Sequence, residues 1–411
     1  FWVAHLGADA VATVGLTESM LTLMYAVAIG LGIGATAMVA RRIGEKNHEG
    51  AARAAVQAIV LGLLVSVVFA VVGVSLAPKL LSMMGGSPWV VEHGSRFTKI
   101  MFAGNASILL LFLINAIFRG AGDAAIAMRV LWLANAINIL LGPCFIFGLG
   151  PFPEMGVAGA AVATTIGRST GVLYAFSRLI RSGGRFDILR RHIMIEPAIM
   201  ARLLRLSATG TFQVFIGMAS WIGLIRTISS FGSDAVAGYT IGIRVIIFAL
   251  LPSWGMANAA ATMVGQALGA GKPDRAERAV WKAGFYNMLC LGVVGAVFVV
   301  FAPQIIALFT DDPKVVPYGI DCLRIVSYGF LFYAYGMVIT QSFNGAGDTW
   351  TPTIINLFVF WLWELPLAYV LAIVFEIGPR GVFMAILIAF STLAVVSALL
   401  FRRGKWKTRV V

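Results

Sequence analysis

Charged residues are scarce in this chain of 411 residues, at 12% of the total, while hydrophobic residues make up 60%. An ordinary soluble domain is about 25% charged and about 45–50% apolar, so this composition excludes a soluble globular protein. Stretches without any charge, such as 57–77 and 100–118, have about the 20 residues needed to cross a bilayer. We therefore interpret the chain as an all-α integral membrane protein.

Cysteine and histidine are also scarce, and each scarcity excludes a class of site. The three cysteines stand apart in apolar sequence, which excludes a disulfide framework and a C-x-x-C motif. The four histidines are isolated, and neither H-E-x-x-H nor a phosphate-binding loop is present. The sequence therefore predicts no metal site, no nucleotide cofactor and no enzymatic activity.

Hydropathy and turn residues predict eleven membrane spans, separated where Gly, Pro or charged residues cluster. The spans are expected at 10–36, 54–77, 97–118, 124–148, 157–180, 203–230, 235–263, 280–302, 318–342, 350–375 and 381–402.

The net charge of +13 is explained by topology, without a nucleic-acid partner. Because positive residues stay on the cytoplasmic side, the connections rich in Lys and Arg are expected in the cytoplasm, including the C-terminus. The chain should therefore lie in the inner (cytoplasmic) membrane with many spans. The basic connections are 41–53, 119–129, 178–205, 272–282 and 402–409.

An internal repeat divides the chain. LGADAVA at 6–12 returns as FGSDAVA at 231–237, and FRGAGD at 118–123 returns as FNGAGD at 343–348, both at an offset of 225. A constant offset indicates tandem duplication. In both copies of the GAGD motif, we expect glycine to end one helix and the aspartate to cap the next.

The repeat also predicts the domain organisation. Counting back by 225 places the counterpart of the span 203–230 mostly before Phe1, so we expect a first helix that is largely missing here and an intact protein of twelve helices. Six helices per lobe give both lobes the same orientation, related by a pseudo-two-fold axis along the membrane normal. The lobes are expected at 1–182 and 203–411, joined by a cytoplasmic linker at 183–202.

Several motifs, in this order and with this duplication, resemble the multidrug and toxic compound extrusion (MATE) family of prokaryotic type. They are LGADAVATVGL, IGATAMVARRIGE, FRGAGD, MVGQALGAGKPDRAERA and FNGAGDTWTP. The resemblance covers essentially the whole chain. It implies two six-helix lobes that export drugs or organic cations in exchange for H⁺ or Na⁺ by alternating access. We expect small amphipathic, cationic substrates and a functional monomer in the bilayer.

Polar side chains inside predicted spans are the leading site candidates, because they are costly in a bilayer. The candidates in the first copy are Asn115, Asn135, Asn138 and Thr164, and the second copy has Thr340, Phe360, Trp363 and Ala389 at the equivalent positions. We therefore predict a polar pocket in the first lobe and an aromatic wall with Phe360 and Trp363 in the second. The resemblance associates the four polar positions with a drug or ion site, and hydrogen bonding between helices is the alternative.

Two acids inside predicted spans, Glu18 and Glu364, are the candidates for binding the coupling ion or the substrate. A carboxyl at membrane depth suits a proton carrier, and pairing with Arg226 or Arg244 is the alternative. Relatives of the resembled family often carry an aspartate where this chain has Gly142, and another in the first helix. We expect that helix-1 aspartate upstream of Phe1.

Two other functions remain open at this point. A flippase for lipid-linked polar precursors would need a strongly cationic central cavity. Three cations within or near the predicted spans, Arg168, Arg226 and Arg244, could line such a cavity, which is weak support. An intramembrane transferase would need clustered His, Asp or Glu, which the sequence does not have.

Overall fold

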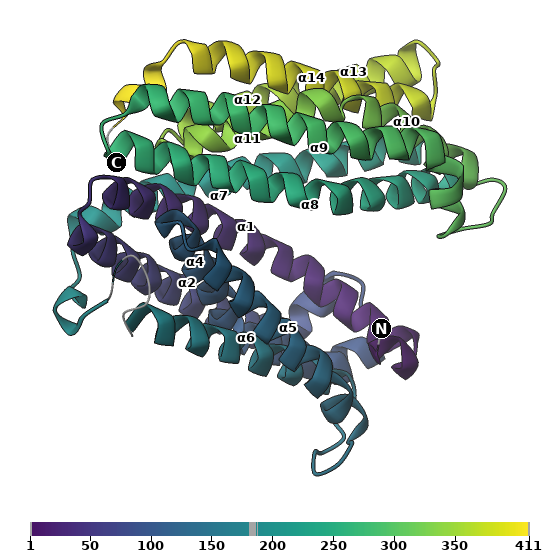
Figure 1. Ribbon diagram of the computed structural model, residues 1–411. Helices are drawn as coiled ribbons and strands as arrows, with labels where there is room; N and C mark the ends of the chain where they lie inside the picture. The colour runs from purple at the N-terminus through teal and green to yellow at the C-terminus, as the bar shows by residue number, and fades with distance from the viewer. Residues whose placement is uncertain (1, 181–185, 187, 410–411) are drawn as a thin grey trace. The chain divides into compact units, whose positions relative to one another are not determined.

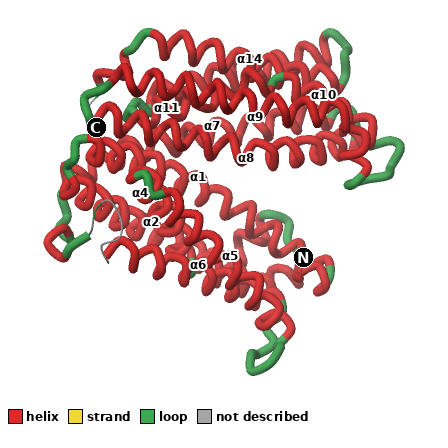
Figure 2. The backbone as a smooth tube through the Cα atoms, in the orientation of Figure 1, coloured by secondary structure: helices red, strands yellow, loops and turns green. Residues whose placement is uncertain are grey.

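The computed structural model describes residues 2–180, 186 and 188–409, and within these ranges every regular element is a helix. Figures 1 and 2 show long helices joined by short loops. The elements of the first half are η1 (Trp2–Leu6), α1 (Ala8–Gly44), α2 (His48–Met83), η2 (Val90–Gly94), α3 (Ser95–Ala103), α4 (Asn105–Ala121), α5 (Ala124–Phe147), α6 (Val157–Ile180) and η3 (Arg190–His192). Those of the second half are α7 (Pro197–Ser229), α8 (Ser233–Gly269), α9 (Pro273–Ala307), α10 (Val316–Tyr328), α11 (Phe330–Gly345), α12 (Trp350–Asn356), η4 (Leu357–Glu364), α13 (Leu365–Tyr369), η5 (Val370–Val374), α14 (Pro379–Arg402) and η6 (Lys405–Thr408).

The described helices confirm the all-helical membrane architecture. Nine spans are long and apolar enough to cross a bilayer, and α10 with α11, bent by 59°, makes a tenth. The eleventh predicted span coincides with α6, a helix of 24 residues in which Thr164, Thr165 and Arg168 lower the hydropathy. Each predicted span therefore corresponds to a helix or to a run of consecutive helices.

The duplication is visible in the helix boundaries. Subtracting 225 from the bounds of α8 gives 8–44, which are the bounds of α1. The same subtraction moves the start of α9 to residue 48, where α2 begins, and the start of α11 to residue 105, where α4 begins. The second copy thus repeats the helical framework of the first.

The chain forms two compact units. The first unit comprises Phe1–Ile43 and Asn47–Thr211, and the second comprises Gly44–Lys46 and Phe212–Val411. The unit boundary falls within α7, whose first turns pack with the first unit. The lobe limits expected at 183–202 stay a prediction, and residues 183–185 and 187 of that linker lie outside the described ranges.

The first glycine of each GAGD motif allows two helix backbones to approach closely. A Cβ added at Gly345 of α11 would overlap the carbonyl oxygen of Ala261 in α8. A Cβ added at Gly120 of α4 would lie 3.0 Å from the carbonyl oxygen of Thr36 in α1. Since Thr36 and Ala261 are also 225 residues apart, the same helix crossing recurs in both units. The motif is therefore a packing element as well as a turn.

The second glycine of each motif makes the predicted turn, with φ of 89° at Gly122 and 84° at Gly347. Such a left-handed backbone is readily adopted only by glycine. Asp348, one residue before the N-cap Thr349 of α12, accepts hydrogen bonds from the backbone N–H of Thr351 at 3.4 Å and from its hydroxyl at 2.7 Å, so its side chain does bond the first turn of the next helix.

The predicted cap is wrong in the first copy. Asp123 occupies the N-cap position of α5, but its side chain makes no capping hydrogen bond. Its backbone, at φ −102° and ψ 51°, lies outside the extended region from which an N-cap side chain reaches back to the first turn.

Gly345→Ala should destabilise the second unit, because the new methyl group would collide with backbone rather than with a movable side chain. Overpacking of this kind costs about 1–3 kcal/mol. We expect a lower melting temperature in detergent. Gly255→Ala is the matched control, since nothing lies within 4 Å of a Cβ there and alanine favours the helix. Equal melting temperatures for the two variants would contradict the packing role.

Candidate functional site

Two of the predicted polar residues meet in the first unit. The Thr164 hydroxyl donates a hydrogen bond of 3.3 Å to Oδ1 of Asn138, which joins α6 to α5. The two helices approach closely because α6 carries small residues every four positions. A Cβ at Gly167, for example, would lie 2.6 Å from the carbonyl oxygen of Ala134. Small residues on one face let backbones meet in a membrane, and here they position the polar pair.

The same face of α6 carries a cation one turn further on. Arg168 Nη2 donates a hydrogen bond of 3.3 Å to the phenol oxygen of Tyr25 in α1. The ring of Tyr25 lies 6.0 Å from that of Phe112 in α4. We call Tyr25, Asn138, Thr164 and Arg168 the α6 polar strip. It offers an amide, two hydroxyl groups and a guanidinium group along one helix of the first unit.

The other two predicted polar residues lie apart from this strip. Asn115 is buried in α4 with 3% of its surface exposed, and no hydrogen-bond partner for its Oδ1 is found in the described part of the chain. Asn135 is exposed on α5, and no hydrogen bond joins it to the strip among the described residues. Asn115 is therefore the more informative of the two, since a buried, unsatisfied amide oxygen requires an explanation.

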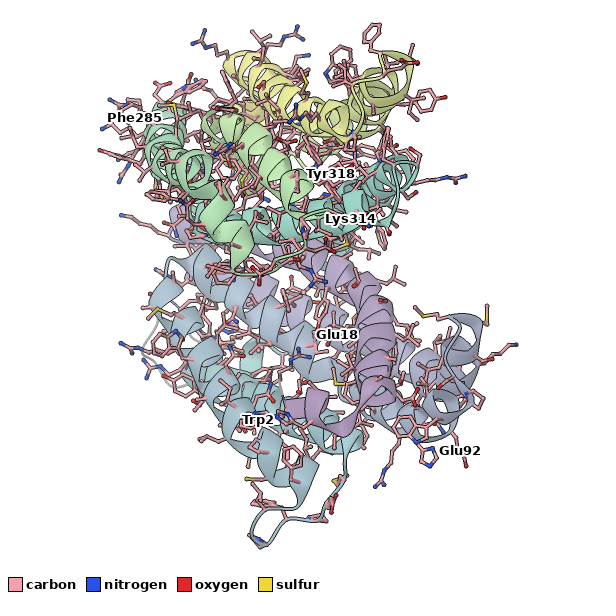
Figure 3. The ribbon with its side chains drawn as sticks, turned by 90° about the vertical axis from the view of Figure 1, so that its right-hand side faces the viewer. Trp2, Glu18, Glu92, Phe285, Lys314 and Tyr318 are labelled. Atoms are coloured by element: carbon pink, nitrogen blue, oxygen red, sulfur yellow. The ribbon has the colours of Figure 1, made fainter. Side chains whose placement is uncertain are left out.

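Glu18 lies on α1 and is half-buried (Figure 3). Its neighbour Thr17 is fully buried and shares a hydrogen bond of 2.8 Å with Thr98 of α3. Gly142 is packed against Trp2, whose ring would lie 3.5 Å from a Cβ at that position. The structure thus places an indole ring beside the position where an aspartate was anticipated from the resemblance.

Glu364 ends the π-helical segment η4 and is buried in the second unit, with 3% of its surface exposed. Tyr239 in α8 and Tyr333 in α11 belong to the same unit and lie within the range of a long-distance electrostatic interaction with this carboxyl group. Among the described residues no cation pairs with Glu364, and the hydroxyl of Tyr239 is buried without a hydrogen-bond partner. A buried carboxyl group that no described cation neutralises can accept a proton or bind a cation.

The predicted aromatic residues surround Glu364 only in part. Phe360, one turn earlier on η4, is half-buried against the apolar core of the second unit. Trp363 is 39% exposed and Trp361 is 41% exposed. Trp361 donates its indole N–H to the carbonyl oxygen of Ile216 in α7 at 3.0 Å, so it holds η4 to α7.

Sequence reasoning did not find the tyrosines of either cluster. Tyr25, Tyr239 and Tyr333 each lie in an apolar helical segment. A tyrosine in such a segment is normally interpreted as a packing residue. The available signal was the hydroxyl group, because a buried tyrosine usually finds a hydrogen-bond partner. Arg168 was considered as one of three arginines that could serve a flippase, and the structure adds its contact with Tyr25.

Comparison with known proteins agrees with this architecture. The family described as MatE matches residues 1–144 and 209–370. The chain is 27% identical to the probable multidrug resistance protein YoeA of Bacillus subtilis (strain 168), over 94% of this chain and 84% of that protein. It is 26% identical to the probable multidrug resistance protein NorM of Thermotoga maritima, over 100% of this chain and 88% of that protein. A solved outward-facing MATE family transporter superposes with a TM-score of 0.91 at 28% identity, covering 99% of this chain and 91% of that one.

The hydrogen bond between Asn138 and Thr164 should be measurable as a coupling between two variants. We expect Asn138→Ala and Thr164→Val, made singly and together, to show a coupling free energy of about 0.5–2 kcal/mol, as for other hydrogen bonds within membranes. Reversible unfolding of the purified protein measures it. Strictly additive effects would show that the 3.3 Å contact contributes nothing to stability.

Proposed function

The chain belongs to the MatE family, whose members are transporters and not enzymes, and on this premise we propose that it is a secondary active exporter of small amphipathic organic cations. Entry or binding of H⁺ or Na⁺ would supply the energy. In this proposal the chain acts as a monomer in the inner membrane, with residues 183–202 and the C-terminus in the cytoplasm. The multidrug resistance proteins among its relatives support the substrate class.

The observation that carries the proposal is the buried carboxyl group of Glu364. A carboxylate at membrane depth is costly unless a proton, an ion or a cationic ligand neutralises it. Tyr239 and Tyr333 of the same unit lie within electrostatic range of it, and Phe360 lies one turn away along the helix. This set can bind an organic cation through charge and cation–π attraction and can alternatively hold a proton.

Competition at Glu364 would couple the two ligands. A substrate cation and a coupling ion cannot both neutralise one carboxylate, so binding of one favours release of the other. Each ligand shifts the equilibrium between access states only through its different affinity for them. Alternating access of the two lobes then converts an ion gradient into export.

The α6 polar strip has a different role in this proposal. Arg168 carries a positive charge next to Asn138 and Thr164, so the strip disfavours a bare cation and suits polar, uncharged groups of a substrate. We assign hydrogen bonding to Asn138 and Thr164 and, with its unsatisfied oxygen, to Asn115. Asn135, Glu18 and Trp363 remain candidates for the outer parts of a substrate path, because all three are at least partly exposed.

A flippase for lipid-linked polar precursors is the second candidate, and Arg168 is the observation that favours it. A guanidinium group held by Tyr25 at membrane depth could attract a phosphate. A flippase would not transport an organic cation, so an assay of ethidium transport distinguishes a flippase from a cation exporter.

Glu364→Gln should uncouple transport. In proteoliposomes with ethidium as the probe, we expect wild-type uptake to follow an imposed H⁺ or Na⁺ gradient. Uptake by the variant should be about 10- to 100-fold lower, since hydrogen bonds to charged groups contribute about 1.5–3 kcal/mol. Glu376→Gln, which changes an exposed carboxylate of the same unit, is the control. Wild-type uptake that ignores both gradients would overturn the antiport proposal.

Asn138→Ala should lower ethidium transport more than it lowers stability. The structural control is Asn287→Ala, because Nδ2 of Asn287 donates a hydrogen bond of 3.0 Å to the carbonyl oxygen of Ala334 and so links α9 to α11. We expect that control to lower the melting temperature while transport per folded molecule stays near wild type. If Asn138→Ala behaves like Asn287→Ala, its amide only holds helices together.

A further inference from the structure

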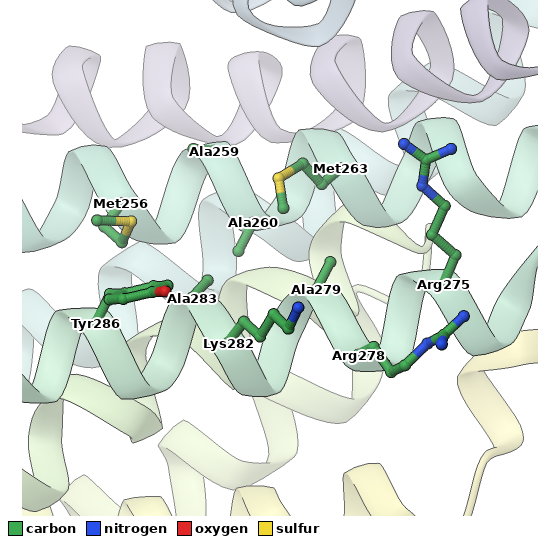
Figure 4. A pocket seen from close by; sticks show the side chains of 10 residues that line it. All are labelled: Met256, Ala259, Ala260, Met263, Arg275, Arg278, Ala279, Lys282, Ala283 and Tyr286. Carbon is green, nitrogen blue, oxygen red and sulfur yellow. The ribbon is translucent and has the colours of Figure 1, made fainter.

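A groove of about 470 Å³ lies between α8 and α9 in the second unit, away from the residues discussed above. Arg275 and Arg278 of α9 line one end of it, Met256 of α8 and Tyr286 of α9 line the other, and Lys282 of α9 lies between them (Figure 4). In this view the Lys282 amine points along the groove towards the arginine end. The groove is therefore cationic at one end and apolar at the other.

The three cations lie on one face of α9, at spacings of three and four residues. Such neighbouring like charges repel each other, and no ion pair relieves them in the described part of the chain. The nearest acids along α9 are already engaged, because Asp274 and Glu277 lie 3.5 Å and 2.6 Å from the amine of Lys407. The groove thus presents positive charge that the described residues do not neutralise.

The first unit has an equivalent groove, but there the equivalent arginine is paired with a carboxylate. This groove measures about 290 Å³ and is lined by Met38, Arg53 and Ala54, which are the counterparts of Met263, Arg278 and Ala279. There Arg53 is paired with Glu196 at 3.5 Å, and the first turns of α7 also line the groove. In the first copy the protein's own chain supplies the carboxylate. In the second copy the corresponding arginine has no such partner among the described residues.

The apolar end of the second groove continues onto a face suited to lipid. Phe285 and Tyr286 are 46% and 60% exposed, and Leu289 and Val293 follow as exposed apolar residues of α9. Phe285 lies at the outer edge of its unit in Figure 3. With 35 residues α9 is about 50 Å long, so it extends beyond a hydrocarbon core of about 30 Å. Its first turns, with the three cations, therefore fall at headgroup level on the side that the positive residues mark as cytoplasmic.

We propose that the α8–α9 groove binds an anionic phospholipid. Its phosphate contacts Arg275, Arg278 and Lys282, and an acyl chain lies along Met256, Met263 and Tyr286. Basic pockets between membrane helices on the cytoplasmic side have the chemistry for such headgroups. A free phosphate satisfies only the cationic end and leaves the apolar end in contact with water. A phospholipid satisfies both ends.

The test uses the full chain in neutral phosphatidylcholine nanodiscs, titrated with phosphatidylglycerol or with inorganic phosphate. Native mass spectrometry counts bound phosphatidylglycerol, and the melting temperature reports stabilisation. We expect phosphatidylglycerol to bind and to raise the melting temperature, whereas inorganic phosphate does neither. The variant R275Q/R278Q/K282Q should bind phosphatidylglycerol at least about tenfold more weakly, because each cation contributes to binding an anionic surface.

The matched control is R129Q/R205Q/R403Q, which removes the same charge from exposed cations that line neither groove. It should retain wild-type binding of phosphatidylglycerol. Ala279→Trp, which fills the groove without changing charge, should also abolish binding, and its melting temperature in phosphatidylcholine shows that it is folded. The proposal would be overturned if the control lost phosphatidylglycerol binding to the same extent. It would also be overturned if inorganic phosphate or added phosphatidylcholine raised the melting temperature as much as phosphatidylglycerol does.

Discussion

The absence of water inside a bilayer is the constraint on which this structure depends. Every backbone group in a span must be satisfied within its own helix, and apolar side chains gain little by leaving lipid for protein. Helices are therefore held together by close backbone approach at small residues. Gly345 against Ala261, Gly120 against Thr36 and Gly167 against Ala134 are three of the points where helix backbones approach closely. The same constraint requires each polar side chain at membrane depth to bond its own helix, as Thr340 and Ser342 do, to bond another helix, or to serve a ligand.

The duplication separates these two uses. Both units keep the crossing at the GAGD glycine and nearly the same helix boundaries, so these features belong to the framework. The polar features differ. The first unit joins α5 to α6 through Asn138 and Thr164, whose counterparts Trp363 and Ala389 cannot form that bond. The second unit instead buries Glu364, an acid without a paired cation among the described residues. One framework thus carries a hydrogen-bonding strip in one copy and an acid in the other.

The helices and turns of the framework could be predicted from the sequence, because each depends on the residues of one short segment. Uncharged runs determined the spans, and glycine determined the turns at Gly122 and Gly347. The spacing of Thr164 and Arg168 placed both on one face of α6. Contacts between distant helices were not predictable in this way. Tyr25 of α1 contacts Arg168 of α6, 143 residues later in the chain, and no local pattern marks this pair.

The exposure of Asn135 shows a second limit. α5 is apolar on all sides, so its sequence does not distinguish the face that meets lipid from the face that meets protein. Asn135 and Asn138 were therefore expected together, although only Asn138 packs against α6. The failure of Asp123 as a cap was not predictable either, because both copies have the same motif and its backbone conformation cannot be read from that motif.

Charge placement links the framework to the site. Positive residues at the expected cytoplasmic ends help to fix orientation, but they also repel organic cations that approach from that side. The field of exposed charges falls off over about 10 Å in 0.1 M salt, so the cations nearest a substrate path matter most. Glu196 neutralises Arg53 in the first unit. An anionic lipid at Arg275, Arg278 and Lys282 would do the same in the second. Orientation would then be kept without a barrier to the substrate, and the buried carboxyl group of Glu364 would be available to a cation or a proton.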